Sequence, residues 1–333
     1  MKYPGQIAVL GGGSWATALV KILTDNQVKV SWYIRSQEDI DYLLTKKHNP
    51  KYLTSVQFNT DQLELSSDIN AIVASCEHII LAIPSAFVAA ELSKLTCSLK
   101  RKTIFSAVKG IEPTSELIIG EYLNQEFGIP FNYIGVITGP CHAEEVALER
   151  LSYLTIACMN KRRAHLLANM LSNQYIITNT SRDVIGTEYA AVFKNIYALA
   201  AGIAHGIGYG DNFQAVLIAN AIAEMKTIIK AIKRKRRTLY HSAYLGDLLV
   251  TAYSTFSRNR MFGTMIGKGY TVKSAMMEMN MIAEGYYASK SAHNILERKE
   301  LFDQAPIATS VYRILYKGER PRPVFKELQT RLI

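Results

Sequence analysis

Cysteine is scarce in this sequence, with only 4 residues in 333, and no two of them show CxxC spacing. A framework of disulfide bonds is therefore not expected, and a reducing compartment suits the chain best. Histidine is also sparse, at 7 residues, and His205, His241 and His293 lack the spacing of metal ligands. We expect no bound metal ion.

Long apolar runs are absent as well. No uninterrupted stretch reaches about 18 residues, the length of a membrane-spanning helix. Met1–Gln6 leads directly into a short apolar run, without the basic segment, longer apolar stretch and cleavage site of a signal peptide. These absences predict a soluble, cytoplasmic protein with no integral membrane association.

Acidic residues are outnumbered, 28 against 38 basic residues, which gives a formal net charge of +10. Such a charge favours anionic partners such as phosphorylated metabolites, nucleic acid or an acidic membrane surface, without choosing among them. The densest basic run, Lys233–Arg237, follows an apolar helical pattern and is typical of a solvated helix end. A nucleic-acid-binding or membrane-contacting protein stays open as an alternative.

The chain is long enough for about two domains, and its two halves differ in pattern. Up to about residue 180, short Val- and Ile-rich runs alternate with longer amphipathic ones, as in β-α units that feed a parallel sheet. From about Asp183 onward the apolar residues take helical spacing. We therefore predict an α/β domain with a largely parallel sheet over 1–183 and an all-α domain over 184–333.

Seven apolar runs are predicted as strands of the first domain, near Gln6–Leu10, Val28–Ile34, His78–Ile83, Lys102–Val108, Tyr133–Ile137, Tyr153–Cys158 and Gln174–Ile177. In the second domain, Gly202–Gly210 is too rich in glycine for one regular helix, so we expect it to interrupt the helical pattern.

A glycine-rich segment with the pattern GxGxxA, Gly11–Ala16, lies directly after the first predicted strand and before an apolar helix. There Gly11 permits a tight turn, Gly13 lets a pyrophosphate approach the backbone, and Ala16 allows close packing of helix on strand. This context predicts a Rossmann-type, dinucleotide-binding N-terminal domain. Its predicted cofactor-binding residues in this segment are Gly11, Gly13, Ser14, Trp15 and Ala16.

The end of the second predicted strand favours NADP over NAD. An acidic residue usually binds the ribose 2'-hydroxyl of NAD at this position, but Arg35 stands here, and its planar fork of donors suits a 2'-phosphate. Glu38 and Asp39 follow closely, so NAD remains the alternative cofactor.

Eight segments, in order along nearly the whole chain, resemble bacterial NAD(P)-dependent glycerol-3-phosphate dehydrogenases. They are GGGSWATAL from Gly11, IPS from Ile83, VKGIE from Val108, TGPCHAEE from Thr138, VFKNIYALAAGIAHGIGYGDN from Val192, LGDLLVT from Leu245, SRNRMFG from Ser257 and EGYYASK from Glu284. The resemblance implies reversible reduction of dihydroxyacetone phosphate to sn-glycerol 3-phosphate in a homodimer that supplies phospholipid synthesis.

Ketone reduction needs a proton donor and fixed positive charge beside the substrate oxygen. Lys194 lies in an apolar helical pattern, where desolvation can lower its pKa, and the resemblance makes it the general acid in reduction and the proton acceptor in oxidation. Asn195 could orient substrate or cofactor. From the residues alone, a surface lysine on an amphipathic helix is the competing interpretation.

The resemblance assigns further residues to catalysis and to the substrate. Lys109, at the end of a predicted strand, would contact substrate and cofactor, although it could simply cap a turn. Asp247 would hold Lys194 or a substrate hydroxyl, although it could cap a helix. The phosphate would be bound by Ser257, Arg258 and Asn259, with Arg258 also near the cofactor.

Five more positions carry over from the resemblance. Gly139, Cys141 and Ala143 would form a loop that meets substrate and cofactor, while Ile282 and Glu284 would contact the cofactor. Many relatives have a hydroxyl residue where this chain has Cys141, so a backbone contact is expected there, since a thiol donates only weakly.

These assignments predict a small phosphorylated substrate as the partner and no nucleic acid. The competing enzyme is a two-domain reductase of a 2-keto acid, whose substrate carboxylate could also bind Arg258.

Overall fold

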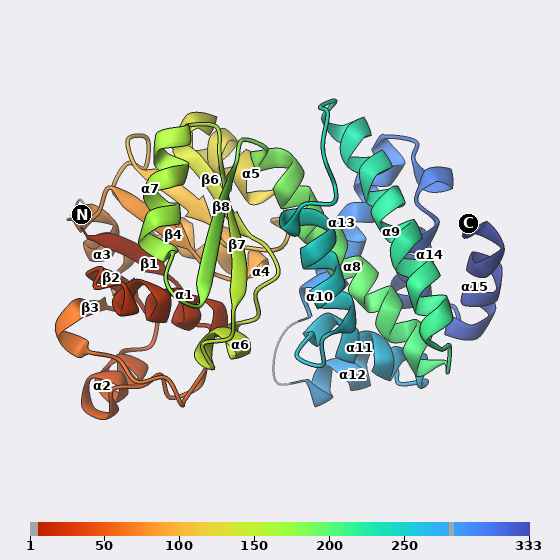
Figure 1. The fold of residues 1–333 in the computed structure, drawn as a ribbon, viewed down its shortest axis with the longest axis horizontal. Helices are drawn as coiled ribbons and strands as arrows, with labels where there is room; N and C mark the ends of the chain where they lie inside the picture. Colours follow the sequence, from red (N-terminus) through yellow and green to blue (C-terminus); the bar gives the residue numbers. More distant parts are fainter. Residues whose placement is uncertain (1–5, 280–282) are drawn as a thin grey trace. The chain divides into compact units, whose positions relative to one another are not determined.

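The computed structural model describes residues 6–279 and 283–333, and the chain divides into two compact units (Figure 1). The first unit contains the chain up to Val108 and then Leu117–Val184. The second contains Lys109–Glu116 and the chain from Ile185 onward. The short segment Lys109–Glu116 therefore leaves the first unit, packs with the second, and returns.

The first unit is built on a sheet of eight strands in the order β3-β2-β1-β4-β5-β6-β7-β8. All neighbouring pairs are parallel except β6 and β7, which are antiparallel, so the predicted largely parallel sheet is confirmed. The strands are β1 (Ile7–Leu10), β2 (Val30–Tyr33), β3 (Leu63–Ser66), β4 (His78–Leu81), β5 (Thr103–Ser106), β6 (Ile134–Thr138), β7 (Ser152–Cys158) and β8 (Ile176–Ser181).

Strand β3 was not among the seven predicted strands. It has four residues, Leu-Glu-Leu-Ser, and lies at the edge of the sheet, where none of them is fully buried. Its alternating apolar and polar residues lack the continuous apolar run that marked the inner strands, because at the sheet edge they are only partly covered.

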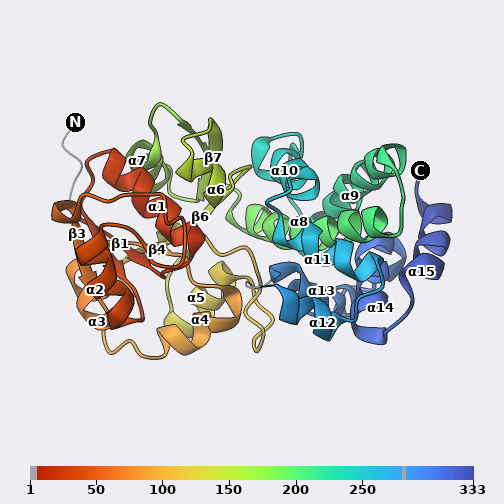
Figure 2. The ribbon, with the colours of Figure 1, turned by 90° about the horizontal axis from the view of Figure 1, so that it is seen from below.

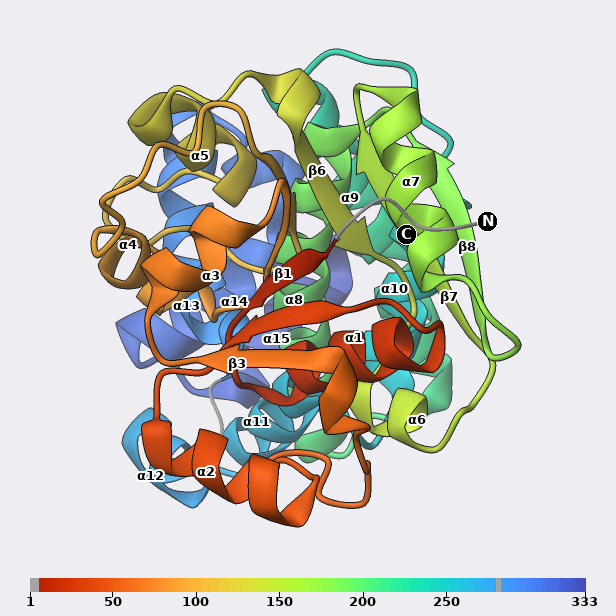
Figure 3. The same cartoon turned by 90° about the vertical axis from the view of Figure 1, so that its left-hand side faces the viewer.

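Helices cover both faces of the sheet, because successive side chains of a strand point to opposite faces. In β1, Ile7 and Val9 pack in one core with α1 and α7, whereas Ala8 and Leu10 pack in the other with α3, α4 and α5; Figure 3 shows the two layers. The helices of this unit are α1 (Ser14–Asp25), α2 (Gln37–Lys46), α3 (Ile69–Ser75), α4 (Ser85–Leu92), α5 (Ile119–Phe127), α6 (Ala143–Ala147) and α7 (Lys161–Leu171).

From Ile185 onward, the described part of the second unit contains helices and no strand, as predicted (Figure 2). A single π-helical turn, Ser242–Gly246, precedes α10. The α-helices are α8 (Val184–Gly206), α9 (Asp211–Ile232), α10 (Asp247–Tyr253), α11 (Arg258–Gly267), α12 (Val272–Glu278), α13 (Glu284–Arg298), α14 (Pro306–Lys317) and α15 (Pro321–Leu328). Across 6–279 and 283–333, no helix has both the length and the apolar character needed to cross a membrane.

The predicted interruption at Gly202–Gly210 is wrong in its first half, because α8 continues to Gly206. The glycines serve close packing there. A Cβ on Gly202 would lie 2.1 Å from the carbonyl oxygen of Arg260 in α11, and a Cβ on Gly263 would lie 2.2 Å from a carbonyl oxygen of α8. Tertiary contact thus outweighs the low helix propensity of glycine, and the backbones of α8 and α11 pack closely together.

Candidate active site

The glycine-rich loop between β1 and α1 contains two glycines of different kinds. Gly11 has a φ of 125°, and a Cβ there would lie 2.4 Å from the carbonyl oxygen of Ala82, so the fold itself requires glycine. Gly13 has an ordinary φ of −78°, and apart from its two chain neighbours no described residue has an atom within 4 Å of its potential Cβ. Neither the backbone conformation nor the packing of the protein requires glycine at Gly13. The position therefore leaves space for an external group.

The loop directs its carbonyl groups into the protein. Each of three consecutive glycine carbonyls accepts a hydrogen bond: Gly11 from the Trp32 indole at 2.7 Å, Gly12 from the Asn49 amide at 3.2 Å, and Gly13 from the Thr17 amide and hydroxyl at 2.9 Å each. The amides of the first helical turn have no intrahelical acceptor, so this end of α1 presents donors and the positive end of the helix dipole. An anionic pyrophosphate suits that surface.

Trp32 and Asn49 were missed by the sequence interpretation. Trp32 is a buried residue of β2 that looks like core, and Asn49 lies in a loop after α2 with no motif around it. Only the folded chain brings the two side chains to the glycine loop, so no local spacing could have indicated them.

Arg35 follows β2 and is exposed, and within the described residues no carboxylate pairs with its guanidinium. The two acidic alternatives differ. Asp39 forms an ion pair with Lys51 at 2.8 Å, whereas Glu38 lies in the first turn of α2. Ser36 caps the same helix, because its hydroxyl oxygen accepts from the Asp39 amide at 3.1 Å.

The remaining predicted cofactor and substrate positions are spread over both units. Gly139 and Cys141 follow β6 in the first unit, and Ala143 begins α6. Cys141 is buried. Glu284 is the first residue of α13 in the second unit, and Ile282 lies outside the described residues.

The second unit buries a lysine against an aspartate. Lys194 on α8 is only 3% exposed, and its Nζ donates a hydrogen bond to Oδ1 of Asp247, the first residue of α10, which is 1% exposed. Burial lowers the pKa of Lys194 to about 7; the Lys109 cation adds to this effect, and Asp247 opposes it. A lysine with this pKa can both donate and accept a proton near neutral pH.

Local structure places Asp247 opposite the lysine. The π-helical turn Ser242–Gly246 ends immediately before it, and such turns rotate the following residues relative to a regular helix. Asp247 was predicted either to hold Lys194 or to cap a helix, and the structure brings the carboxylate and the ammonium together.

A chain of amide hydrogen bonds lies next to this pair. The Asn195 side chain donates to the carbonyl oxygen of Lys109 at 2.8 Å and accepts from the Asn259 side chain at 2.9 Å, and Asn259 accepts from the Gly285 amide at 2.9 Å. Both asparagines are buried. The chain therefore connects Lys109, α8, α11 and the start of α13.

The segment predicted to bind phosphate forms the start of α11. Ser257 is buried and caps this helix, because its hydroxyl oxygen accepts from the Arg260 amide at 3.3 Å. Its hydroxyl hydrogen is still a donor. Arg258, half-buried, is the first helical residue, so a guanidinium lies at the positive end of the helix.

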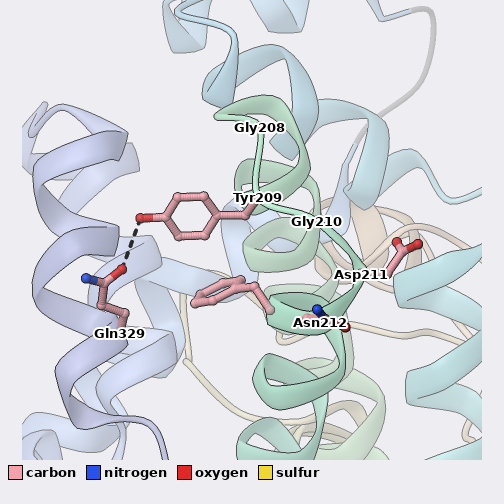
Figure 4. Close-up of a pocket in the computed structure, with 7 residues that line it drawn as sticks. Gly208, Tyr209, Gly210, Asp211, Asn212 and Gln329 are labelled. Carbon is pink, nitrogen blue, oxygen red and sulfur yellow. Dashed lines mark hydrogen bonds between the residues drawn. The ribbon is translucent and has the colours of Figure 1, made fainter.

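A separate open hollow lies where α8 is followed by α9 (Figure 4). None of the predicted site residues lines it, so it belongs to neither group of residues above. Its lining consists of Gly208, Tyr209, Gly210, Asp211, Asn212, Phe213 and Gln329, and the Tyr209 hydroxyl donates to the Gln329 side chain at 3.3 Å.

An open, largely parallel sheet with a glycine-rich loop after β1, together with a helical unit that buries a lysine of lowered pKa, is the construction of a dinucleotide-dependent dehydrogenase. Family comparison agrees. Residues 6–164 match the N-terminal and residues 183–326 the C-terminal model of NAD-dependent glycerol-3-phosphate dehydrogenase. The chain belongs to this family.

Individual relatives align with nearly the whole chain. Glycerol-3-phosphate dehydrogenase [NAD(P)+] of Limosilactobacillus reuteri (strain DSM 20016) is 33% identical over 332 residues, covering 98% of this chain and 97% of the relative. The crystal structure of glycerol-3-phosphate dehydrogenase from Coxiella burnetii has a TM-score of 0.90 at 29% identity and covers 98% of this chain and 99% of that one.

The chain is much less similar to a reductase of a 2-keto acid, the competing enzyme. A ketopantoate reductase from Ralstonia eutropha superposes with a TM-score of 0.59 at 12% identity, covering 97% of this chain and 99% of that one. This likeness reaches the fold alone, so the comparisons do not favour the alternative substrate.

Proposed function

We propose that the chain catalyses the reversible reduction of dihydroxyacetone phosphate to sn-glycerol 3-phosphate, with NADPH or NADH as the reductant, and so supplies glycerophospholipid synthesis. The observation that carries the proposal is the buried Lys194–Asp247 pair in a member of this family, with Lys109 beside it. A ketone that gains hydride becomes an alkoxide, and this cluster contains both the proton and the positive charge which that oxygen needs.

Each residue of the cluster has a distinct task in this proposal. Protonated Lys194 donates from Nζ to the developing alkoxide during reduction, and neutral Lys194 removes the hydroxyl proton during oxidation. Asp247 orients the ammonium through its hydrogen bond. Lys109 keeps the local charge positive and lowers the pKa of Lys194, so that neither form of the lysine is rare near pH 7.

The start of α11 is the proposed phosphate site. A phosphate there would receive bidentate hydrogen bonds from Arg258, a hydrogen bond from the Ser257 hydroxyl, and the favourable end of the helix dipole. We assign Asn259 a substrate contact through the amide hydrogen that its bond to Asn195 does not use. Gly139 and Cys141 would contribute backbone contacts.

In the first unit the glycine loop would hold the cofactor pyrophosphate over Gly13, with Ser14, Trp15 and Ala16 in the first turn of α1. A bound nicotinamide dinucleotide supplies the hydride. Arg35 would bind the adenosine 2'-phosphate, which favours NADP, since Asp39 is held by Lys51. Ala143, Ile282 and Glu284 complete the proposed cofactor contacts, together with Lys109 and Arg258.

In this proposal residues 1–183 form the dinucleotide-binding domain and residues 184–333 the substrate-binding domain, with Lys109–Glu116 acting alongside the latter. We further propose a cytoplasmic homodimer, to be checked by light scattering of the purified protein and by fractionation of cells that express it.

A spectrophotometric assay tests the proposal. Purified protein should oxidise NADPH and NADH with dihydroxyacetone phosphate and should be inactive with ketopantoate. The rate constant kcat for reduction should fall as pH rises above about 7, because Lys194 loses its proton there, and kcat for oxidation should rise over the same range. Absence of turnover with dihydroxyacetone phosphate, or turnover with ketopantoate alone, would refute the proposed substrate.

A further inference from the structure

The segment Lys109–Glu116, called the strap below, belongs to the second unit although the chain on both sides of it belongs to the first. It also carries Lys109, whose cation lowers the pKa of the buried Lys194. Two neighbouring ammonium groups repel each other, and the repulsion grows where water is excluded. An arrangement of this kind therefore requires that the strap be fixed in place.

One end of the strap is fixed to α8. The carbonyl oxygen of Lys109 accepts the hydrogen bond from the buried Asn195 side chain at 2.8 Å, and Asn195 is itself held by Asn259. This contact anchors the backbone of the strap one residue along α8 from Lys194.

The interior of the strap is a closed turn around a buried carboxylate. Glu112 accepts hydrogen bonds from the Ser115 amide at 2.6 Å, the Ser115 hydroxyl at 2.7 Å and the Thr114 amide at 3.2 Å. Burial alone would raise the pKa of Glu112, but these hydrogen bonds outweigh it and hold the pKa below its usual value. The carboxylate thus stays ionised and keeps the turn closed between the two ends of the strap.

The other end is fixed to α13. Glu116 accepts a hydrogen bond from the Asn294 side chain and forms an ion pair with Arg298 at 3.2 Å. Its backbone has a φ of 57°, in the left-handed region that favours glycine or asparagine over glutamate. This backbone conformation is unfavourable for a glutamate, and the contacts of its carboxylate with α13 offset that cost.

We propose that Glu116, with Asn294 and Arg298, is a positioning residue for the reaction: it clasps the strap to α13 and thereby keeps the Lys109 cation beside Lys194. The clasp acts through Lys109, and it rests on the proposed function only for its effect on turnover. Among the described residues, the charged groups that act on Lys194 are Asp247 from α10 and Lys109 from the strap. When the clasp opens, Asn195 still holds the Lys109 backbone, but the rest of the strap is released. The Lys109 cation is then held less closely beside Lys194, and the pKa of Lys194 rises.

The informative variant is Glu116→Asn, because asparagine tolerates the left-handed backbone but is too short to reach both partners on α13. We expect the apparent pKa of kcat for reduction to rise by roughly 0.5–1 unit, with Lys109→Met giving at least as large a shift and Arg298→Met a smaller one. The matched control is Arg313→Met, which removes an ion pair with Glu319 in the same unit without touching the strap, and should leave the pKa unchanged.

A second readout needs no turnover. The Cε resonance of Lys194 in protein carrying ¹³C-labelled lysine, assigned by its loss in Lys194→Met, reports the pKa directly. An upward shift in Glu116→Asn supports the clasp even if dihydroxyacetone phosphate is not a substrate, so the two proposals fail separately. If the resonance titrates as in the wild type in both Glu116→Asn and Arg298→Met, while circular dichroism shows folded protein, the clasp has only a structural role and the proposal is overturned.

Discussion

The glycine loop of the first unit and the lysine cluster of the second are built in opposite ways. The loop is one continuous stretch, Gly11–Ala16, that acts through its backbone. The cluster joins side chains from α8, α10 and the strap, at Lys194, Asp247 and Lys109, whose positions in the chain are far apart. Binding by backbone is encoded locally, whereas a perturbed pKa requires burial and neighbours that only the whole fold supplies.

The largest expected effect is that of removing Lys194 from the lysine cluster. Lys194→Met removes the proton donor but keeps an apolar side chain of similar length, so kcat for reduction should fall about 10²- to 10⁴-fold, the usual share of general acid catalysis. Stopped-flow or steady-state measurement of NADPH oxidation gives the loss.

The dissociation constant for NADPH, from protein fluorescence, is the control for Lys194→Met and should stay within about twofold of the wild type, because the glycine loop lies in the other unit. A variant that retained full kcat would show that another group supplies the proton.

Two substitutions in the glycine loop test whether it binds the cofactor through its backbone. Gly13→Ala places a methyl group in space that the protein leaves open, so thermal stability should be unchanged while the KM for NADPH rises, roughly tenfold. Gly11→Ala places the same group 2.4 Å from the Ala82 carbonyl at a φ of 125°, so it should lower the free energy of unfolding by about 1–3 kcal/mol.

Thermal denaturation and KM measured on both loop variants separate the two roles. Equal loss of stability in Gly13→Ala and Gly11→Ala would contradict the view that glycine is needed at Gly13 for ligand binding and not for folding.

The same contrast explains what the sequence could predict. Six of the eight strands follow from buried apolar runs, and the loop follows from its place between strand and helix. The edge strand β8 was predicted over Gln174–Ile177 but runs over Ile176–Ser181, and only Ile176 in it is buried. Strand β3 was not foreseen because an exposed edge strand lacks such a run. The passage of α8 through Gly202 was not foreseen because it depends on the approach of α11, a contact between residues about 60 positions apart.

In the site, the family resemblance suggested the acid and its partner, but not the hydrogen bonds among Asn195, Asn259 and Gly285, nor the clasp at Glu116. An amide that bonds to another amide leaves no pattern along the chain. The sequence and the resemblance therefore proposed residues for ligand contact, but they did not show which residues hold others in place. Asn49 behind the glycine loop is in this respect the counterpart of Asn195 beside the lysine.

The smallest expected effect concerns the one side chain proposed to refine what the backbone loop binds. Arg35 is exposed at the end of β2, where a 2'-phosphate would gain charge-assisted hydrogen bonds that water partly weakens. Arg35→Ala should therefore lower kcat/KM for NADPH about tenfold and leave kcat/KM for NADH within about twofold. The exposed Arg162 on α7 gives a control, since Arg162→Ala should change neither value. The preference should also weaken as salt is raised, because the charge is in contact with solvent. If Arg35→Ala lowers both values equally, Arg35 supports the loop and does not distinguish the cofactors, and the selection of NADP must then come from elsewhere in the first unit.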